Sequence, residues 1–194
     1  MAKKESTLLS MSLTLLVITA VSAASLGFMY ELTKEPKAAA ELQKQNFAIM
    51  AVLPAFDNSP SEDAFAIETF DGQGEQLICY PATKDGELVG IAVRTWTMTG
   101  YSGLIRIMVG FDQSGNIINT SVLEHQETPG LGTKMAEPPF KDQFMNKNPA
   151  KNNIALRRDG GEIDGITAAT ITARAFSDAV MRAHRSLDAA GKFE

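Results

Sequence analysis

The sequence is poor in the residues that bind metals and haem. Its 194 residues include one cysteine, Cys79, and two histidines, His125 and His184, which are far apart in the chain. A single cysteine excludes an internal disulfide, a CxxCH haem site and a four-cysteine iron–sulfur cluster. Two separated histidines disfavour a protein-ligated zinc site. Cys79 itself stands among apolar neighbours and is expected to be a buried small hydrophobe.

The chain also lacks an excess of basic charge. Lysine and arginine number 18 against 23 aspartate and glutamate residues, which gives a formal net charge of −5. Nucleic-acid-binding domains usually carry a basic face, so we expect no nucleic-acid partner. Removing the apolar N-terminal segment leaves about 160 residues, enough for one domain with its own core.

Charged residues are absent from Ser6 to Tyr30, and the core of this span, Leu8 to Met29, is apolar or small throughout. A helix rises about 1.5 Å per residue, so this span can cross a hydrocarbon layer of about 30 Å. Lys3 and Lys4 precede it, and the positive-inside rule then keeps the N-terminus in the cytoplasm. We expect a single-pass protein of the cell inner membrane, whose body lies on the periplasmic or outer side.

A cleaved signal peptide is the alternative to a retained anchor. Val21, Ser22 and Ala23 resemble the small residues of a cleavage site. The apolar run is longer than a typical signal core and continues to Met29, which favours the anchor. Residues 1–30 are therefore assigned to the cytoplasmic tip and the transmembrane anchor.

The rest of the chain predicts an α+β fold, with a mostly antiparallel sheet packed by helices. Residues 31–60 are expected to form a helical stalk and connection, with a helix from Glu35 to Leu53 and Pro36 in its first turn. Residues 61–194 form the extracytoplasmic domain, in which short Asp-Gly-type turns between apolar runs imply antiparallel pairing. Strands are expected at 65–70, 76–80, 88–97, 105–111, 117–123 and 154–157, a helical turn at 140–145, and a last helix from about 167 to 190.

A small, hydroxyl-rich segment, residues 164–172, opens that last helix. Free backbone N–H groups and the positive end of the helix dipole at such a start suit a phosphate group. The alternative is structural, because threonines near a helix start are usually caps. Thr167 is placed to accept a hydrogen bond from the N–H of Thr170, and the segment alone favours this capping role.

Three segments together resemble the FMN-binding domain family. Residues 164–170 read D-G-I-T-A-A-T, which is similar to the family's flavinylation motif D-x-x-(S/T)-G-A-T. Residues 125–132 read H-Q-E-T-P-G-L-G and match the family's H-x-E-T-P-G-L-G loop, and Gly100-Tyr101-Ser102-Gly103 before the 105–111 strand also resembles the family. Ala168 stands where the family most often has glycine, and alanine disfavours a positive φ.

The resemblance implies a covalent FMN. Thr170 is the residue whose hydroxyl joins the FMN phosphate, and Asp164 belongs to the sequence that a separate flavin transferase recognises, an enzyme that uses FAD and a divalent cation. Arg157 or Arg158 is placed to balance phosphate charge, although a solvated strand end is the other interpretation of both. The other implied cofactor contacts are Thr167, Ala168, Ala169, Glu127, Thr128, Leu131 and Tyr101.

The whole pattern further resembles the G subunit of Rnf-type electron transport complexes, which move electrons between ferredoxin and NAD and couple this to ion translocation. The resemblance implies a non-autonomous electron-carrier subunit, in which the FMN relays electrons between neighbouring membrane subunits and no side chain acts as an acid–base catalyst. The C subunit of the sodium-translocating NADH:quinone oxidoreductase shares the domain and is the nearest rival. An anchored extracytoplasmic flavoprotein redox sensor and an anchored scaffold without flavin are two more interpretations of the same sequence.

Overall fold

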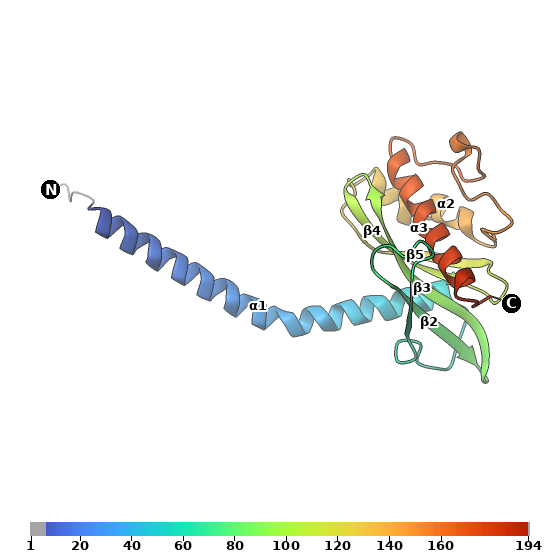
Figure 1. Cartoon of the computed structure of the whole chain (residues 1–194), viewed down its shortest axis with the longest axis horizontal. Helices are drawn as coiled ribbons and strands as arrows, with labels where there is room; N and C mark the ends of the chain where they lie inside the picture. Colours follow the sequence, from blue (N-terminus) through green and yellow to red (C-terminus); the bar gives the residue numbers. More distant parts are fainter. Residues whose placement is uncertain (1–6, 194) are drawn as a thin grey trace. The chain divides into compact units, whose positions relative to one another are not determined.

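The computed structural model describes residues 7–193 (Figure 1). These residues fall into two compact units that divide between Gln43 and Lys44. The expected basic flank of the anchor, Lys3 and Lys4, lies outside the described residues. The domain limits expected from the sequence, at residues 30 and 60, stay predictions.

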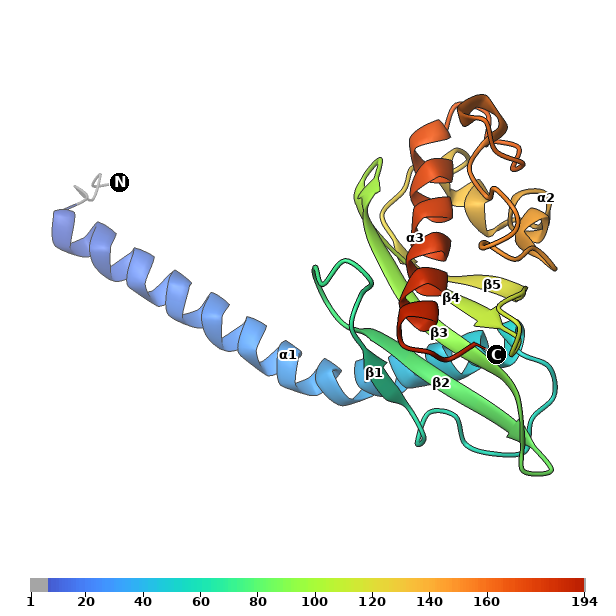
Figure 2. The same ribbon diagram turned by 45° about the vertical axis from the view of Figure 1, so that its right-hand side comes forward.

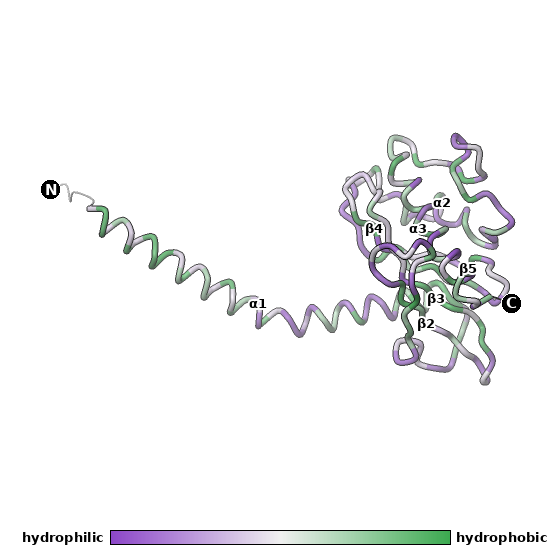
Figure 3. The backbone as a smooth tube through the Cα atoms, in the orientation of Figure 1, coloured by the Kyte–Doolittle hydropathy of each residue, from purple (hydrophilic) through white to green (hydrophobic). Residues whose placement is uncertain are grey.

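The N-terminal unit consists of the first part of helix α1 (Leu8–Val52). This part is long and apolar enough to cross a membrane, and none of its apolar stretch is buried within the chain. Figure 3 shows the same stretch as predominantly hydrophobic. The length and composition of this stretch therefore fit the predicted anchor. A signal sequence can have the same length and composition.

The predicted start of a separate helix at Glu35 is wrong, because α1 continues through Pro36. A proline inside a helix removes one backbone hydrogen bond and disfavours the preceding turn. Here it is flanked by strong helix formers, Lys34 and Glu35 before it and Lys37 with three alanines after it. These flanks favour helix on both sides, so the proline interrupts the hydrogen bonding without ending the element.

The second unit is built on a five-stranded sheet in the order β1-β2-β3-β4-β5, and every neighbouring pair is antiparallel. This confirms the predicted α+β class. Asp85 and Gly86, predicted as a turn, have φ angles of 53° and 84°, as the two-residue turn between long strands requires. The strands are β1 (Phe65–Ile67), β2 (Leu77–Lys84), β3 (Glu87–Gly100), β4 (Gly103–Phe111) and β5 (Ile117–His125).

One face of the sheet packs against helix α3 (Thr170–Ala189), as Figure 2 shows. Alternate residues of β4, Ile105, Ile107 and Val109, are fully buried on this side, as the two-residue period of a strand requires. Cys79 lies in the same core, and burial raises the pKa of its thiol to about 12. The prediction that Cys79 is a buried small hydrophobe is thus confirmed.

The other face packs against the last turns of α1, from Lys44 onwards. Ile49 and Val52 meet Met108 of β4 and Ala92 of β3 in a second core. The backbones come close here, because a Cβ added to Gly110 would lie 2.0 Å from the carbonyl oxygen of Val52. The end of α1 is therefore part of the folded domain and not only a connection to it.

Residues 126–169 carry short elements between β5 and α3. The predicted helical turn is present, as α2 (Pro138–Lys141) followed by the 3-10 turn η2 (Asp142–Phe144). The predicted strand at 154–157 is wrong, because Leu156 makes only an isolated parallel bridge to Ile163 before the turn η3 (Arg157–Asp159) begins. The turn η1 (Gly132–Ala136) begins at the last residue of the predicted cofactor loop.

The last helix begins at Thr170 and not at Thr167. Ala168 has a φ of 61° and Ala169 a φ of −136°, and neither angle is helical. The local backbone therefore delays the helix by three residues.

Candidate functional site

A cavity of about 580 Å³ lies where three separate segments meet: the turn between β3 and β4, the loop after β5, and the start of α3. Its volume falls within the range of small-molecule and cofactor sites, which is about 300–1,000 Å³. The lining residues are Tyr101, Glu127, Thr128, Leu131, Gly132, Ala168, Ala169, Thr170, Ile171 and Thr172.

The cavity brings together every predicted cofactor contact except Thr167. Thr167 and Asp164 are exposed and do not line it. Sequence reasoning missed Gly132, Ile171 and Thr172. Gly132 is the last residue of the matched loop and Thr172 is the last residue of the hydroxyl-rich segment. The sequence motifs therefore already contained both positions. The individual roles of all these residues toward a cofactor stay predictions.

Glu127 ties the three segments together in the wall of the cavity. It is only 5% exposed, and both carboxylate oxygens accept hydrogen bonds, from the Thr172 hydroxyl at 2.6 Å and from the Ser102 N–H at 3.0 Å. A Cβ added to Gly132 would lie 2.6 Å from Oε2 of Glu127, so a side chain at this position would displace the carboxylate. None of the ion pairs found between described residues includes Glu127. The cavity wall thus carries a buried acidic group held by neutral donors.

The start of α3 presents free N–H groups to the same region. Ala169 occupies the N-cap position, and no described side chain caps the first turn. The alternative that Thr167 is a helix cap is therefore wrong, because the left-handed backbone at Ala168 separates it from the helix. The first turn keeps its positive dipole end and its backbone donors for another acceptor.

The two candidate arginines differ in what they contact. Arg158 donates from Nη1 to Oγ1 of Thr170 at 3.1 Å. Arg157 instead places its Nε 3.0 Å from Oδ1 of Asp164. Both belong to the turn η3, so the predicted strand end does not exist. Of the two, Arg158 is the one beside the predicted attachment residue.

The turn that carries Arg158 is fastened to α3 by a neighbouring ion pair. Asp159 accepts hydrogen bonds from Nε and Nη2 of Arg174, both at 2.6 Å. These bonds hold the pKa of the Asp159 carboxyl below its ordinary value and raise the pKa of Arg174. Two parallel bonds of this kind fix relative orientation as well as distance.

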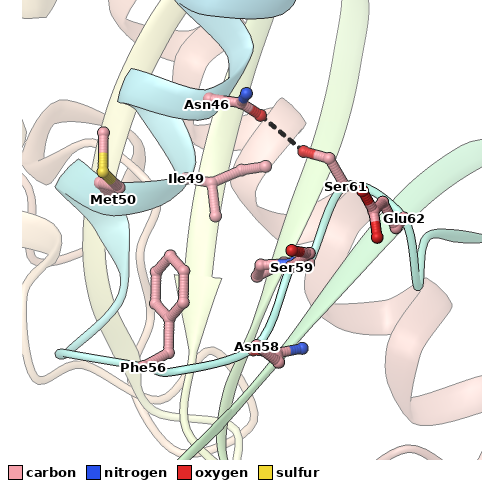
Figure 4. A pocket seen from close by; sticks show the side chains of 9 residues that line it. Asn46, Ile49, Met50, Phe56, Asn58, Ser59, Ser61 and Glu62 are labelled. Atoms are coloured by element: carbon pink, nitrogen blue, oxygen red, sulfur yellow. Dashed lines mark hydrogen bonds between the residues drawn. The ribbon is translucent and has the colours of Figure 1, made fainter.

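A second cavity of about 390 Å³ lies between the end of α1 and the loop that follows it (Figure 4). Ile49, Met50 and Phe56 give it an apolar wall, and Ser61 donates a hydrogen bond of 2.6 Å to Asn46 at its edge. It contains none of the three segments that resemble the flavin family. Across residues 7–193, no group of three or more His, Cys, Asp or Glu side chains is placed to hold a metal ion.

Comparison with known proteins places the chain in a family. The sequence model described as "FMN-binding domain" matches residues 100–185, which contain all three segments of the larger cavity. The G subunit of the ion-translocating oxidoreductase complex of Vibrio vulnificus is 34% identical over 176 residues, 87% of this chain and 83% of the relative. The protein of the same name from Haemophilus influenzae is 36% identical over 154 residues, 76% of this chain and 74% of the relative.

The chain belongs to the family of these G subunits. The family predicted from the sequence motifs is thereby confirmed. Among solved structures, the C subunit of the Na(+)-translocating NADH-quinone reductase from Parabacteroides distasonis aligns with a TM-score of 0.49 at 18% identity, covering 71% of this chain and 77% of that one. In this member of the G-subunit family, α1 and strands β1 and β2 lie wholly before the matched FMN-binding domain.

Proposed function

We propose that this protein is the electron-transfer subunit of a membrane-bound, ion-translocating ferredoxin:NAD oxidoreductase of the Rnf type, and that it relays electrons through an FMN joined covalently to Thr170. The observation that carries the proposal is the convergence of the three motif segments on one cavity. G-subunit relatives named for an ion-translocating oxidoreductase complex support the assignment to such a complex.

The residues present fit FMN. Tyr101 and Leu131 are 70% and 40% exposed at the cavity, and such apolar groups suit a planar ring that is covered on binding. Ala168 and Ala169 are small enough for close approach to the backbone. The uncapped start of α3 and Arg158 supply donors for a phosphate. Bound FMN supplies reversible electron transfer, and the chain holds and orients it.

Thr170 is the proposed attachment point. Its side chain lies on the first residue of α3 and is partly exposed, so a separate flavin transferase can reach it. The same enzyme takes FAD and a divalent cation, and Asp164 is exposed for recognition. A covalent phosphoester prevents loss of the cofactor from a domain outside the cytoplasm.

Covalent attachment is tested by co-expressing the full chain with a flavin transferase, followed by denaturing electrophoresis and detection of fluorescence in the gel. The wild type and Thr170→Ser, which keeps a hydroxyl, are expected to give a fluorescent band and the mass of one added FMN. Thr170→Ala is expected to give neither. An unlabelled wild type, or a Thr170→Ala band as bright as the wild type, would refute the proposal.

The proposed orientation places the N-terminus in the cytoplasm and the flavin domain on the periplasmic or outer side. A C-terminal alkaline phosphatase fusion, which is active only outside the cytoplasm, is expected to be active. The mass of the mature protein separates an anchor from a cleaved signal, since cleavage after Ala23 would remove most of the apolar span. Co-purification with the other subunits of the complex distinguishes the electron carrier from an isolated redox sensor.

A further inference from the structure

We propose that Arg158 is the cation that receives the flavin phosphate at Thr170, and that the Asp159–Arg174 pair holds it in position. This inference rests on the proposed covalent attachment at Thr170 and adds to it a residue outside the D-x-x-(S/T)-G-A-T motif.

The contact itself is direct. Arg158 Nη1 lies 3.1 Å from the Thr170 hydroxyl oxygen, although the two residues are 12 positions apart in the chain. None of the ion pairs found among residues 7–193 involves Arg158. Its guanidinium carries five N–H donors, so most of its hydrogen-bonding capacity is available beside the reacting oxygen.

The position of Arg158 is fixed from two sides. On one side, Leu156 is 1% exposed and bridges to Ile163, which anchors the chain just before η3. On the other, Asp159 is bound through two hydrogen bonds of 2.6 Å to Arg174. Arg174 lies four residues after Thr170 on α3, and residues at this spacing share a helix face. The pair therefore couples the turn that carries Arg158 to the helix that carries Thr170.

Attachment places new negative charge beside this guanidinium. The Thr170 oxygen forms a bond to the FMN-side phosphorus of FAD, the bond from that phosphorus to the bridging oxygen breaks, and AMP leaves with the electron pair. The hydroxyl proton passes to the transferase or solvent, and no group is oxidised or reduced. The phosphate that stays on Thr170 keeps one negative charge, for which a planar guanidinium is a well-matched partner.

The experiment measures the initial rate of covalent FMN incorporation into the full chain in detergent, with purified transferase, FAD and Mg²⁺, by gel fluorescence and intact mass. Arg158→Gln is expected to be labelled about tenfold more slowly, the size of one charge-assisted hydrogen bond. Arg158→Lys keeps the charge and is expected to recover much of the rate. Arg185→Gln removes a positive charge elsewhere on α3 and is expected to match the wild type.

The role of Asp159 is tested by a double-mutant cycle. Asp159→Asn is expected to slow labelling in the wild-type background and to add little in the Arg158→Gln background, since it acts through Arg158. Additive effects would overturn the positioning role of the pair.

The failure of this inference is distinct from the failure of covalent attachment. An unlabelled wild type refutes attachment at Thr170. A labelled wild type with Arg158→Gln at the same rate refutes only the role of Arg158. Equal slowing in Arg158→Gln and Arg158→Lys, together with a lowered unfolding temperature in both, would show a structural role and also overturn the inference.

Discussion

Replacing Ala168 by glycine is expected to stabilise the domain. Ala168 has a φ of 61°, a left-handed conformation that costs a non-glycine residue about 1–2 kcal/mol. Glycine removes this strain but gains about 0.4–1 kcal/mol of conformational freedom in the unfolded chain. The Ala168 methyl group is exposed, so little packing is lost. The net expectation is a gain of about 0.5–1 kcal/mol, or about 1–4 °C in unfolding temperature for a domain of this size.

The neighbouring alanine supplies the matched control. Ala169 has a φ of −136° and is 7% exposed, so glycine there relieves no strain and removes a buried methyl group. Ala169→Gly is expected to destabilise by about 1 kcal/mol, opposite in sign to its neighbour. Ala168→Val adds β-branching at a positive φ and is expected to destabilise by more than about 1 kcal/mol.

The assay is urea unfolding of the full chain in detergent, followed by tryptophan fluorescence and circular dichroism. Shifts of the same sign for Ala168→Gly and Ala169→Gly would refute the left-handed backbone at residue 168. A glycine variant at 168 that is less stable than the wild type by more than about 0.5 kcal/mol would refute it as well. The same variant is expected to accept flavin at least as well as the wild type, because it restores the residue that the family motif most often has there.

Three further predictions follow from the packing and charges. Gly110→Ala would place a Cβ 2.0 Å from the Val52 carbonyl oxygen. It is expected to lower the free energy of unfolding by about 2–4 kcal/mol, measured by urea unfolding. A decrease of less than about 1 kcal/mol would contradict the close packing of α1 on the sheet. Glu127→Gln keeps the shape of a buried group but removes its negative charge. In the flavin-loaded protein this variant is expected to raise the reduction potential of the flavin by on the order of tens of millivolts. A redox titration that is unchanged from the wild type would contradict this expectation. Hydrogen bonds from Arg174 hold the pKa of Asp159 below its ordinary 3.8, so the pair stabilises the fold fully above about pH 4 and less as the pH falls through the lowered pKa. The urea midpoints of Asp159→Asn and the wild type are expected to differ at pH 7 and to converge as the pH falls through that lowered pKa, and a difference that grows on acidification would contradict this sign.

Much of the sheet could be predicted because its information is local. Strand β4 alternates buried Ile105, Ile107 and Val109 with residues of the opposite face, and Asp85-Gly86 has the composition of a tight turn. The errors came where local signals conflict with their surroundings. Pro36 is a frequent first-turn residue, but the helix formers on both sides of it carry α1 through. The apolar residues near Leu156 read as a strand, yet they have a single bridging partner.

The candidate site was predictable to the extent that its residues lie in contiguous motifs. Tyr101, Glu127 and Thr170 each belong to one of the three segments, and the fold brings these segments to one cavity. Thr172 was not predicted as a cavity residue, because the helix was expected to begin at Thr167 and the left-handed backbone at Ala168 was not expected. The contact of Arg158 with Thr170 is tertiary. It depends on a turn that apolar periodicity does not encode, so the sequence left Arg157 and Arg158 equivalent.

Two hydroxyl groups in the first turn of α3 are hydrogen-bonded to side chains of opposite charge. The hydroxyl of Thr170 accepts a hydrogen bond from Arg158, whereas that of Thr172 donates one to the buried carboxylate of Glu127. Residues two apart on a helix are separated by about 200° around its axis, so the cation and the carboxylate approach α3 from different sides. A ligand with an anionic phosphate and a neutral ring has one favourable orientation in such a field, with its phosphate at Thr170. The charges beside α3 therefore favour an anionic group near Thr170 over one near Thr172.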